Sequence, residues 1–124
     1  MTPIDKFPNL NWTEHTRNEL EEFNMDEVFA RSQLVWQIKD IIAVGLIYTS
    51  FTGPPQMWFA LAEGVTFRDL IDFRRLQEEI PIGTLVTVSS DFKVGHRFAK
   101  FYGFEDTGER KGFKEREFHI YRRV

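Results

Sequence analysis

The sequence predicts an α+β fold in which helices pack on a central, mostly antiparallel sheet. Short runs of apolar and β-branched residues recur at strand length, and other segments place apolar residues at the three- and four-residue spacing of a helix. The 124 residues include 42% hydrophobic residues and thirteen Phe, which is enough for one core and too little for two ordinary domains. We therefore treat residues 1–124 as a single domain.

The composition excludes several classes of site. The chain has no cysteine, which excludes a disulfide framework, a thiolate zinc site and a thiol nucleophile. No apolar run approaches about 18 residues, the length at which a membrane span is expected. The N-terminus lacks the basic start and apolar block of a signal peptide. We expect a soluble protein of the cytosol, or one packaged from it.

The charges are unevenly placed along a chain whose net charge is −3. An acidic cluster lies early in the sequence (Glu19, Glu21, Glu22, Asp26 and Glu27), and a basic cluster lies near its end (Arg110, Lys111, Lys114, Arg116, Arg122 and Arg123). Two separate solvated surfaces are the favoured interpretation. The alternative is a basic C-terminal region that contacts an anionic partner.

Helix-capping residues and the spacing of apolar residues predict the first elements of the chain. Residues 1–11 form an extended lead-in with a short strand near Ile4 to Phe7. Thr13 caps a helix that runs to about Phe23, and a further helical turn covers residues 26–31.

Two strands follow and are predicted to form an antiparallel hairpin. They cover residues 34–38, with Leu34, Trp36 and Ile38 on one face, and residues 41–49. Gly45 inside the second strand marks a bulge or a close approach by another group.

A proline-containing turn at residues 53–55 leads into a third strand, at residues 56–62. Thr66 then caps a helix that ends before Pro81 and Gly83. Its predicted apolar face consists of Phe67, Leu70, Ile71, Phe73 and Leu76.

The rest of the chain is organised around residues 85–104. A strand at residues 85–89 is followed by three candidate helix N-caps, Ser89, Ser90 and Asp91. The helix after them has one apolar stripe (Val94, Phe98, Phe101 and Tyr102). Gly103 ends it, and Phe104 packs back.

The C-terminal part is predicted to be a hairpin arm. Residues 105–116 form a charged, Gly-containing connection, and residues 117–124 form the last strand. Phe118 and Ile120 share one face of that strand, while His119 and Tyr121 share the other.

Two stretches, read together with this order of elements, resemble the GNAT superfamily of N-acetyltransferases. Residues 35–47 resemble its second and third strands, and residues 96–104 resemble its "A-x-x-x-Y-x-x-x-G-F" helix end. The likeness covers roughly residues 32–122. Among GNAT proteins, the Trp58-Phe59 strand and the stretch from His96 to Gly103 are most similar to the acetyltransferase-like internal virion proteins of short-tailed phages. The resemblance implies helices on both faces of a twisted sheet that is splayed between strands 56–62 and 85–89.

The resemblance also implies a site for acetyl-CoA, whose pyrophosphate is held in GNAT enzymes by a "Q/R-x-x-G-x-G/A" loop. Glycines in that loop let backbone N–H groups approach the phosphates at a helix N-terminus. Here the corresponding stretch, residues 62–68, has one glycine and the acidic Glu63. If the groove persists, it is expected to run between residues 58–61 and 85–89 with Thr66 at its phosphate end. The candidate cofactor-binding residues are Trp58, Phe59, Ala60, Leu61, Thr66, Arg68, Ser89 and Ser90.

The catalytic groups of the superfamily are incomplete in this sequence. Its enzymes often use a tyrosine as general acid toward the leaving thiolate, and that position is occupied here by Ala99. Candidate acid–base residues are Glu63, Asp91, His96 and Tyr102, although Tyr102 lies on the apolar stripe and His96 is better explained as a surface residue of the helix. The serines at 89 and 90 are explained as helix caps, and the spacing of the histidines supports no metal site.

Two functional interpretations follow, and a third stays open. The favoured one is a GNAT-fold phage protein with a degenerate acetyl-CoA loop, which acts without catalysis as a structural or binding component of a virion. The alternative is an active acetyl-CoA-dependent N-acetyltransferase with an atypical cofactor loop. The third is an unrelated α+β adaptor, in which strands 56–62 and 85–89 would not splay. We expect protein partners, other virion proteins among them, and a homo-oligomer is compatible with the sequence.

Overall fold

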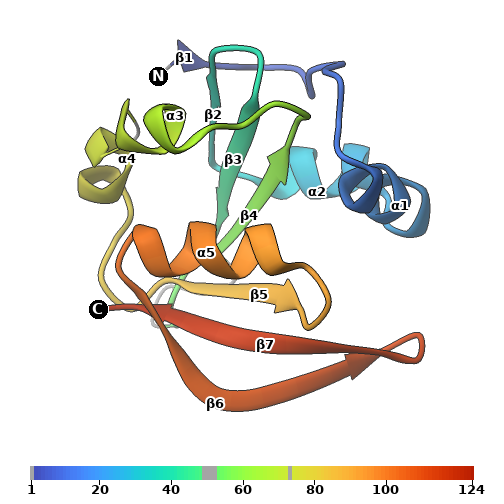
Figure 1. Ribbon diagram of the computed structural model, residues 1–124, viewed down its shortest axis with the longest axis vertical. Coiled ribbons are helices and arrows are strands. Elements are labelled where there is room, and N and C mark those ends of the chain that lie inside the picture. The colour runs from blue at the N-terminus through green and yellow to red at the C-terminus, as the bar shows by residue number, and fades with distance from the viewer. Residues whose placement is uncertain (1, 49–52, 73) are drawn as a thin grey trace.

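The computed structural model describes residues 2–48, 53–72 and 74–124, and these form a seven-stranded sheet with helices on both faces (Figure 1). The strand order is β1-β2-β3-β4-β5-β7-β6. The strands are β1 (Thr2–Pro3), β2 (Leu34–Ile38), β3 (Ile42–Ile47), β4 (Gln56–Leu61), β5 (Leu85–Ser89), β6 (Phe104–Phe113) and β7 (Arg116–Arg123). Neighbouring strands are antiparallel except β4 and β5, which are parallel. The predicted α+β class and the β2–β3 hairpin are confirmed.

The helices are α1 (Glu14–Glu22), α2 (Met25–Arg31), α3 (Phe67–Asp72), α4 (Arg74–Glu79) and α5 (Lys93–Phe101). The side chain of Thr13 caps α1 by accepting the N–H of Thr16, as its sequence predicts. At the start of α5 the prediction was wrong, because Phe92 is the N-cap residue and no side chain caps this helix. Ser89 instead pairs within the sheet with Phe118, and the Ser90 hydroxyl donates to Glu117, so neither serine is available to the helix.

The strands β4 and β5 splay apart, as the resemblance implied. Their register contains only two pairs, Gln56 with Leu85 and Met57 with Val86. Beyond these pairs the two strands point in different directions (Figure 1). The opening therefore lies in the middle of the sheet, between residues 58–61 and 87–89, which is where the candidate groove was placed.

Each face of the sheet has its own core. On the α5 face, residues of β2, β3, β4, β5 and β7 pack with Phe98 and Ala99 of α5 and with its C-cap residue Tyr102. On the α1 face a smaller cluster joins Trp12, Ala43, Ala60 and Ala62, with Trp58 and Leu20 packed against it. The alternation along β4 produces this division, because Met57, Phe59 and Leu61 face α5 whereas Trp58 and Ala60 face α1.

Gly45 of β3 allows β4 to approach closely. A Cβ atom at this position would lie 2.3 Å from the indole ring of Trp58, its partner across the two strands. The indole Nε1 donates to the Ser32 hydroxyl at 2.8 Å, which fixes the ring over the glycine. The predicted close approach at Gly45 is confirmed, and the strand contains no register shift there.

Several predicted apolar positions are solvent-exposed. Leu34, Ile71 and Val94 are 46%, 45% and 48% exposed, so none of them joins the core as the periodic pattern predicted. The predicted first strand near Ile4 lies earlier, at Thr2–Pro3. Phe73 was predicted to lie in the helix that follows Thr66, and Thr49 at the end of the predicted strand 41–49; both lie outside the described residues.

The acidic and basic clusters meet each other in part. Arg116, at the start of β7, forms ion pairs with Glu22 and Glu19 of α1, and Lys114 donates to the Glu22 carbonyl. Phe113 of the hairpin stacks on Phe23 with ring centroids 5.4 Å apart. The hairpin is thus held against α1, and the two charge clusters are not two fully separate solvated surfaces.

None of the helices in the described residues is long and apolar enough to cross a membrane.

Candidate functional site between the diverging strands

A first cavity, of about 310 Å³, lies on the α1 face of the opening. Its wall contains Trp58, Phe59 and Ala60 of β4 and Ser89 at the end of β5. The helix α1 and Phe118 of β7 close its other side. Four of the candidate cofactor-binding residues therefore lie together here.

A second cavity, of about 400 Å³, lies between α5 and the end of β4. It is lined by Leu61, Val65, Thr66, Val94, Arg97, Phe98 and Phe101. Leu61 and Thr66 are the candidate cofactor-binding residues found in this cavity. Arg68 and Ser90 line neither cavity.

An aromatic stack joins the linings of the two cavities. The rings of Phe59, from β4, and Phe98, from α5, lie 4.5 Å apart with an angle of 27° between their planes. Phe59 lines the first cavity and Phe98 lines the second, and Phe98 is 1% exposed. In place of the expected single groove there are thus two separate cavities, whose linings meet where Phe59 packs on the core residue Phe98.

The phosphate end of the expected groove holds a carboxylate of the chain itself. Asp69 accepts the N–H and the hydroxyl of Thr66, each at 2.9 Å, and its own N–H donates back to the Thr66 hydroxyl. These two donors, the backbone N–H first, hold the pKa of Asp69 below its ordinary value, and Lys39 contributes through an ion pair at 3.3 Å. The hydroxyl of Thr66, the residue just before α3, is thus already hydrogen-bonded to the carboxylate of Asp69.

The position of the general acid in the superfamily is apolar and closed. Ala99 is 0% exposed, and the hydroxyl-bearing Tyr102 three residues later is 1% exposed within the same core. Glu63 is exposed and lines neither cavity. Asp91 accepts the Ser89 hydroxyl at 2.5 Å, and this bond lowers the pKa of its carboxyl. These four residues do not converge on one reacting position.

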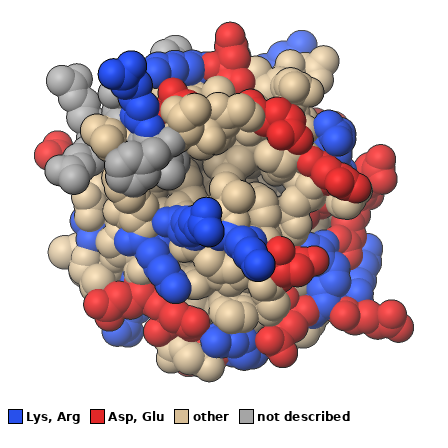
Figure 2. Space-filling view, in the orientation of Figure 1, with Lys and Arg blue, Asp and Glu red and all other residues tan. Residues whose placement is uncertain are grey.

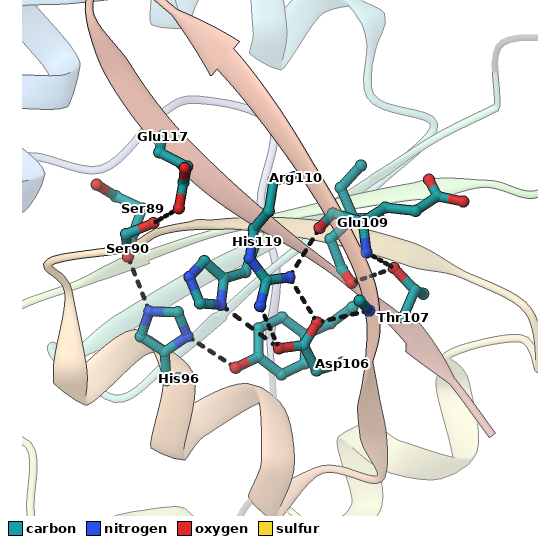
Figure 3. Close-up of polar contacts among 12 residues, drawn as sticks. Ser89, Ser90, His96, Asp106, Thr107, Glu109, Arg110, Glu117 and His119 are labelled. Atoms are coloured by element: carbon teal, nitrogen blue, oxygen red, sulfur yellow. Dashed lines mark hydrogen bonds and ion pairs between the residues drawn. The ribbon is translucent and has the colours of Figure 1, made fainter.

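His96 is the candidate with the most ordered surroundings (Figure 3). Its Nε2 lies 2.9 Å from the Ser89 carbonyl oxygen, and its Nδ1 lies 2.7 Å from the Tyr121 hydroxyl. A carbonyl only accepts, so Nε2 carries the proton, and in the neutral ring Nδ1 accepts from the tyrosine. The expectation of a surface histidine was wrong, because both ring nitrogens are bonded inside the fold.

A second histidine lies beside the first. The rings of His96 and His119 have their centroids 4.7 Å apart, and His119 Nδ1 lies 3.4 Å from Asp106, which also binds Arg110 (Figure 3). Arg110 and the backbone N–H of Gly108 lower the pKa of Asp106 to about 2. Burial, followed by the charge of Asp106, raises the pKa of Tyr121.

The histidine pair was not predicted from the sequence. The available signal was the strand alternation, which placed His119 and Tyr121 on one face, but nothing in the sequence indicated that α5 covers that face. Within the described residues, no three His, Asp or Glu side chains are placed to hold a metal ion. The two histidines are thus held by polar contacts on the α5 face of the sheet.

Comparisons with known proteins agree with the splayed sheet. No family model and no curated protein sequence matches the chain. Among solved structures, a spermidine N-acetyltransferase chimera of SpeG from Vibrio cholerae and hSSAT is similar with a TM-score of 0.55 and 12% identity, over 86% of this chain and 75% of that one. A ribosomal-protein-S5-alanine acetyltransferase from Vibrio fischeri is similar with a TM-score of 0.54 and 12% identity, over 92% and 78%. A ribosomal-protein-alanine N-acetyltransferase from Brucella melitensis is similar with a TM-score of 0.50 and 12% identity, over 90% and 77%. These likenesses show that the chain has the fold of the GNAT acetyltransferases.

Proposed function

We propose that this chain is a GNAT-fold protein that does not transfer acyl groups and instead acts as a binding or structural component, in a phage particle. The observation that carries the proposal is the stack of Phe59 on Phe98. An extended acyl-CoA would need a continuous path between the splayed strands. That path is occupied by two rings whose displacement would open the core on the α5 face.

Two further features support the absence of acyl transfer. The acid position is Ala99, which has no proton to give to a leaving thiolate. At the phosphate end, the carboxylate of Asp69 already holds the Thr66 N–H and hydroxyl, and a phosphate would meet its negative charge. The assignment to a phage particle rests on the likeness of residues 96–103 to the internal virion proteins.

The proposal is tested by calorimetric titration of acetyl-CoA into the purified chain, with Thr66→Glu as the matched control. We expect no saturable heat for the wild type at millimolar ligand and no release of free CoA thiol above the buffer rate. Micromolar binding that is lost in Thr66→Glu would overturn the proposal and support the acetyltransferase alternative.

A second variant asks whether the stack is the barrier. Phe59→Ala removes one ring of the stack at which the linings of the two cavities meet. If the stack blocks the ligand, this variant should bind acetyl-CoA more tightly than the wild type, provided that circular dichroism shows it folded. Equal and measurable binding by both proteins would mean that the ligand bypasses the stack, which contradicts the argument.

A further inference from the structure

The exposed face of α5 has three positive charges and no negative ones. Lys93, Arg97 and Lys100 follow one another at i, i+4 and i+7, so they lie on one side of the helix, and all three are exposed. None of them forms an ion pair with a residue that the structure describes. Figure 2 shows Lys and Arg side chains gathered across the middle of the face where α5 lies in Figure 1.

Only Lys100, in the last turn, favours the dipole of α5; the rest of this arrangement does not serve the stability of the helix. Like charges at i, i+3 and i+4 repel one another and destabilise a helix. A cation in the first turn, as at Lys93, also opposes the helix dipole, and this first turn contains no acidic residue. Arg116 and Arg110, by contrast, are each paired with carboxylates in the fold. Lys93, Arg97 and Lys100 thus form a basic stripe, in which α5 keeps three cations without a counter-charge among the described residues.

The second cavity opens beside this stripe. Arg97 belongs to both, and Val94, which is 48% exposed, lies at the cavity's edge. The cavity wall includes two aromatic rings, Phe98 and Phe101, together with the apolar Leu61 and Val65. A ligand that fits both features has a chain of negative charges and flat apolar groups attached to it.

We propose that α5 and the second cavity bind single-stranded nucleic acid, with backbone phosphates on Lys93, Arg97 and Lys100 and one base in the cavity. The three cations span about 10 Å of helix, enough for a short run of phosphates. A positively charged track beside aromatic side chains is the general solution for single strands. A duplex would leave the cavity unused because its bases are stacked, and an acidic peptide would satisfy the cations alone.

This inference rests on the proposed binding role and names its partner. The acetyl-CoA titration tests a separate statement. If the chain binds both an oligonucleotide and acetyl-CoA, only the proposed absence of acyl transfer is overturned. A chain that binds neither would overturn only the present inference.

The test is fluorescence anisotropy of a labelled 20-nucleotide single strand of mixed sequence, titrated with the wild type and two triple variants. The first variant is Lys93→Gln/Arg97→Gln/Lys100→Gln. The matched control is Lys6→Gln/Arg17→Gln/Arg31→Gln, which removes three exposed positive charges outside both α5 and the basic C-terminal cluster. Gln has nearly the helix propensity of Lys and Arg, so α5 should remain folded.

We expect the α5 variant to bind at least about tenfold more weakly than the wild type at 50 mM salt, and the control to bind within about threefold of it. Three phosphate contacts predict a slope of about −2 for the logarithm of the association constant against the logarithm of salt concentration. The α5 variant should lose most of that slope. No wild-type binding, or equal losses in the two variants, would overturn the inference.

Two further probes separate the nucleic acid from other polyanions. A polyglutamate of equal charge should bind more weakly than the oligonucleotide, and equal affinity would show that the surface prefers acidic protein. An oligonucleotide with abasic sites should also bind more weakly. If the abasic strand binds equally well, the assignment of the cavity to a base is wrong.

Discussion

The Nδ1 atom of His96 lies 2.7 Å from the hydroxyl of Tyr121, which is 1% exposed. This bond joins α5 to β7 across 25 residues, and the Ser89 carbonyl fixes the other ring nitrogen. Helix α5, which forms the exposed basic stripe and one wall of the second cavity, is therefore attached to the sheet by a polar contact as well as by its apolar face.

Replacing Tyr121 by Phe should destabilise the fold by about 1–2 kcal/mol, because a partly buried ring nitrogen of His96 loses its donor. Urea unfolding measures this change, and the ring NMR signals of His96 should shift with it. Tyr48, whose side chain is exposed, provides the control Tyr48→Phe, which should be neutral. Equal stability of Tyr121→Phe and the wild type would show that the bond contributes nothing.

Because of Asp106, the stability of the fold should depend on pH in the acid range. Its pKa is lowered from 3.8 to about 2, mainly by Arg110 and then by the Gly108 N–H. A carboxyl with a depressed pKa in the folded state stabilises that state above its unfolded pKa and loses this contribution as the pH falls. Asp106→Asn should therefore be less stable than the wild type above about pH 4, and the difference should disappear toward pH 2.

Urea midpoints at pH 2, 3, 4 and 7 test this expectation, with the exposed Asp5→Asn as control. A difference between Asp106→Asn and the wild type that stays constant over this pH range would contradict the assignment to the carboxylate of Asp106.

Gly45→Ala should be strongly destabilising because its methyl group would overlap the Trp58 indole ring. Overpacking of this kind costs about 1–3 kcal/mol, and displacement of the ring would also break its bond to Ser32. Thermal unfolding compares it with Gly112→Ala, where the nearest atom is 4.0 Å from the added carbon and the stability should hardly change. Similar melting temperatures for both variants would mean that Trp58 moves without cost.

Arg116 should contribute more to stability than an ordinary surface cation. Its side chain is 26% exposed, pairs with two carboxylates of α1 and lies 5.1 Å from the centre of the Phe118 ring. We expect Arg116→Gln to cost about 1 kcal/mol and to increase hydrogen exchange in the turn of the β6–β7 hairpin. Arg31→Gln is the control, because its ion pair with Glu27 is exposed on both sides and is worth little.

High salt offers a second check on Arg116. The loss on mutation should shrink as salt is added, because part of it is electrostatic. If Arg31→Gln loses as much stability as Arg116→Gln, the contact of Arg116 with α1 contributes no more than an exposed ion pair.

The sheet was predictable from the sequence because its strands are apolar runs bounded by turn residues. Residues 34–38 and 56–61 are found as strands almost at their expected limits. Exposed Val94 and Ile71 show where periodicity alone fails. The pattern identifies the residues that are able to face a core, but the tertiary arrangement determines whether a core is there.

The candidate site was less predictable because it depends on contacts between distant segments. The stack of Phe59 on Phe98 joins positions 39 residues apart by number, and no local pattern announces it. Ser89, Ser90 and Asp91 have the composition of a helix cap, yet the strand pairing of Ser89 and the contact of Ser90 with Glu117 take precedence. The alanine at position 99, by contrast, was visible in the sequence.

The strand β6 ends the sheet with an edge that discourages further growth. All of its residues after Phe104 are exposed, and its pairing with β7 shifts register between Asp106 and Arg110. Charged side chains and an irregular ladder are the means by which natural sheets avoid joining a neighbour edge to edge. In a crowded compartment, where copies of this chain would meet often, β6 is thus a poor template for fibre-like stacking.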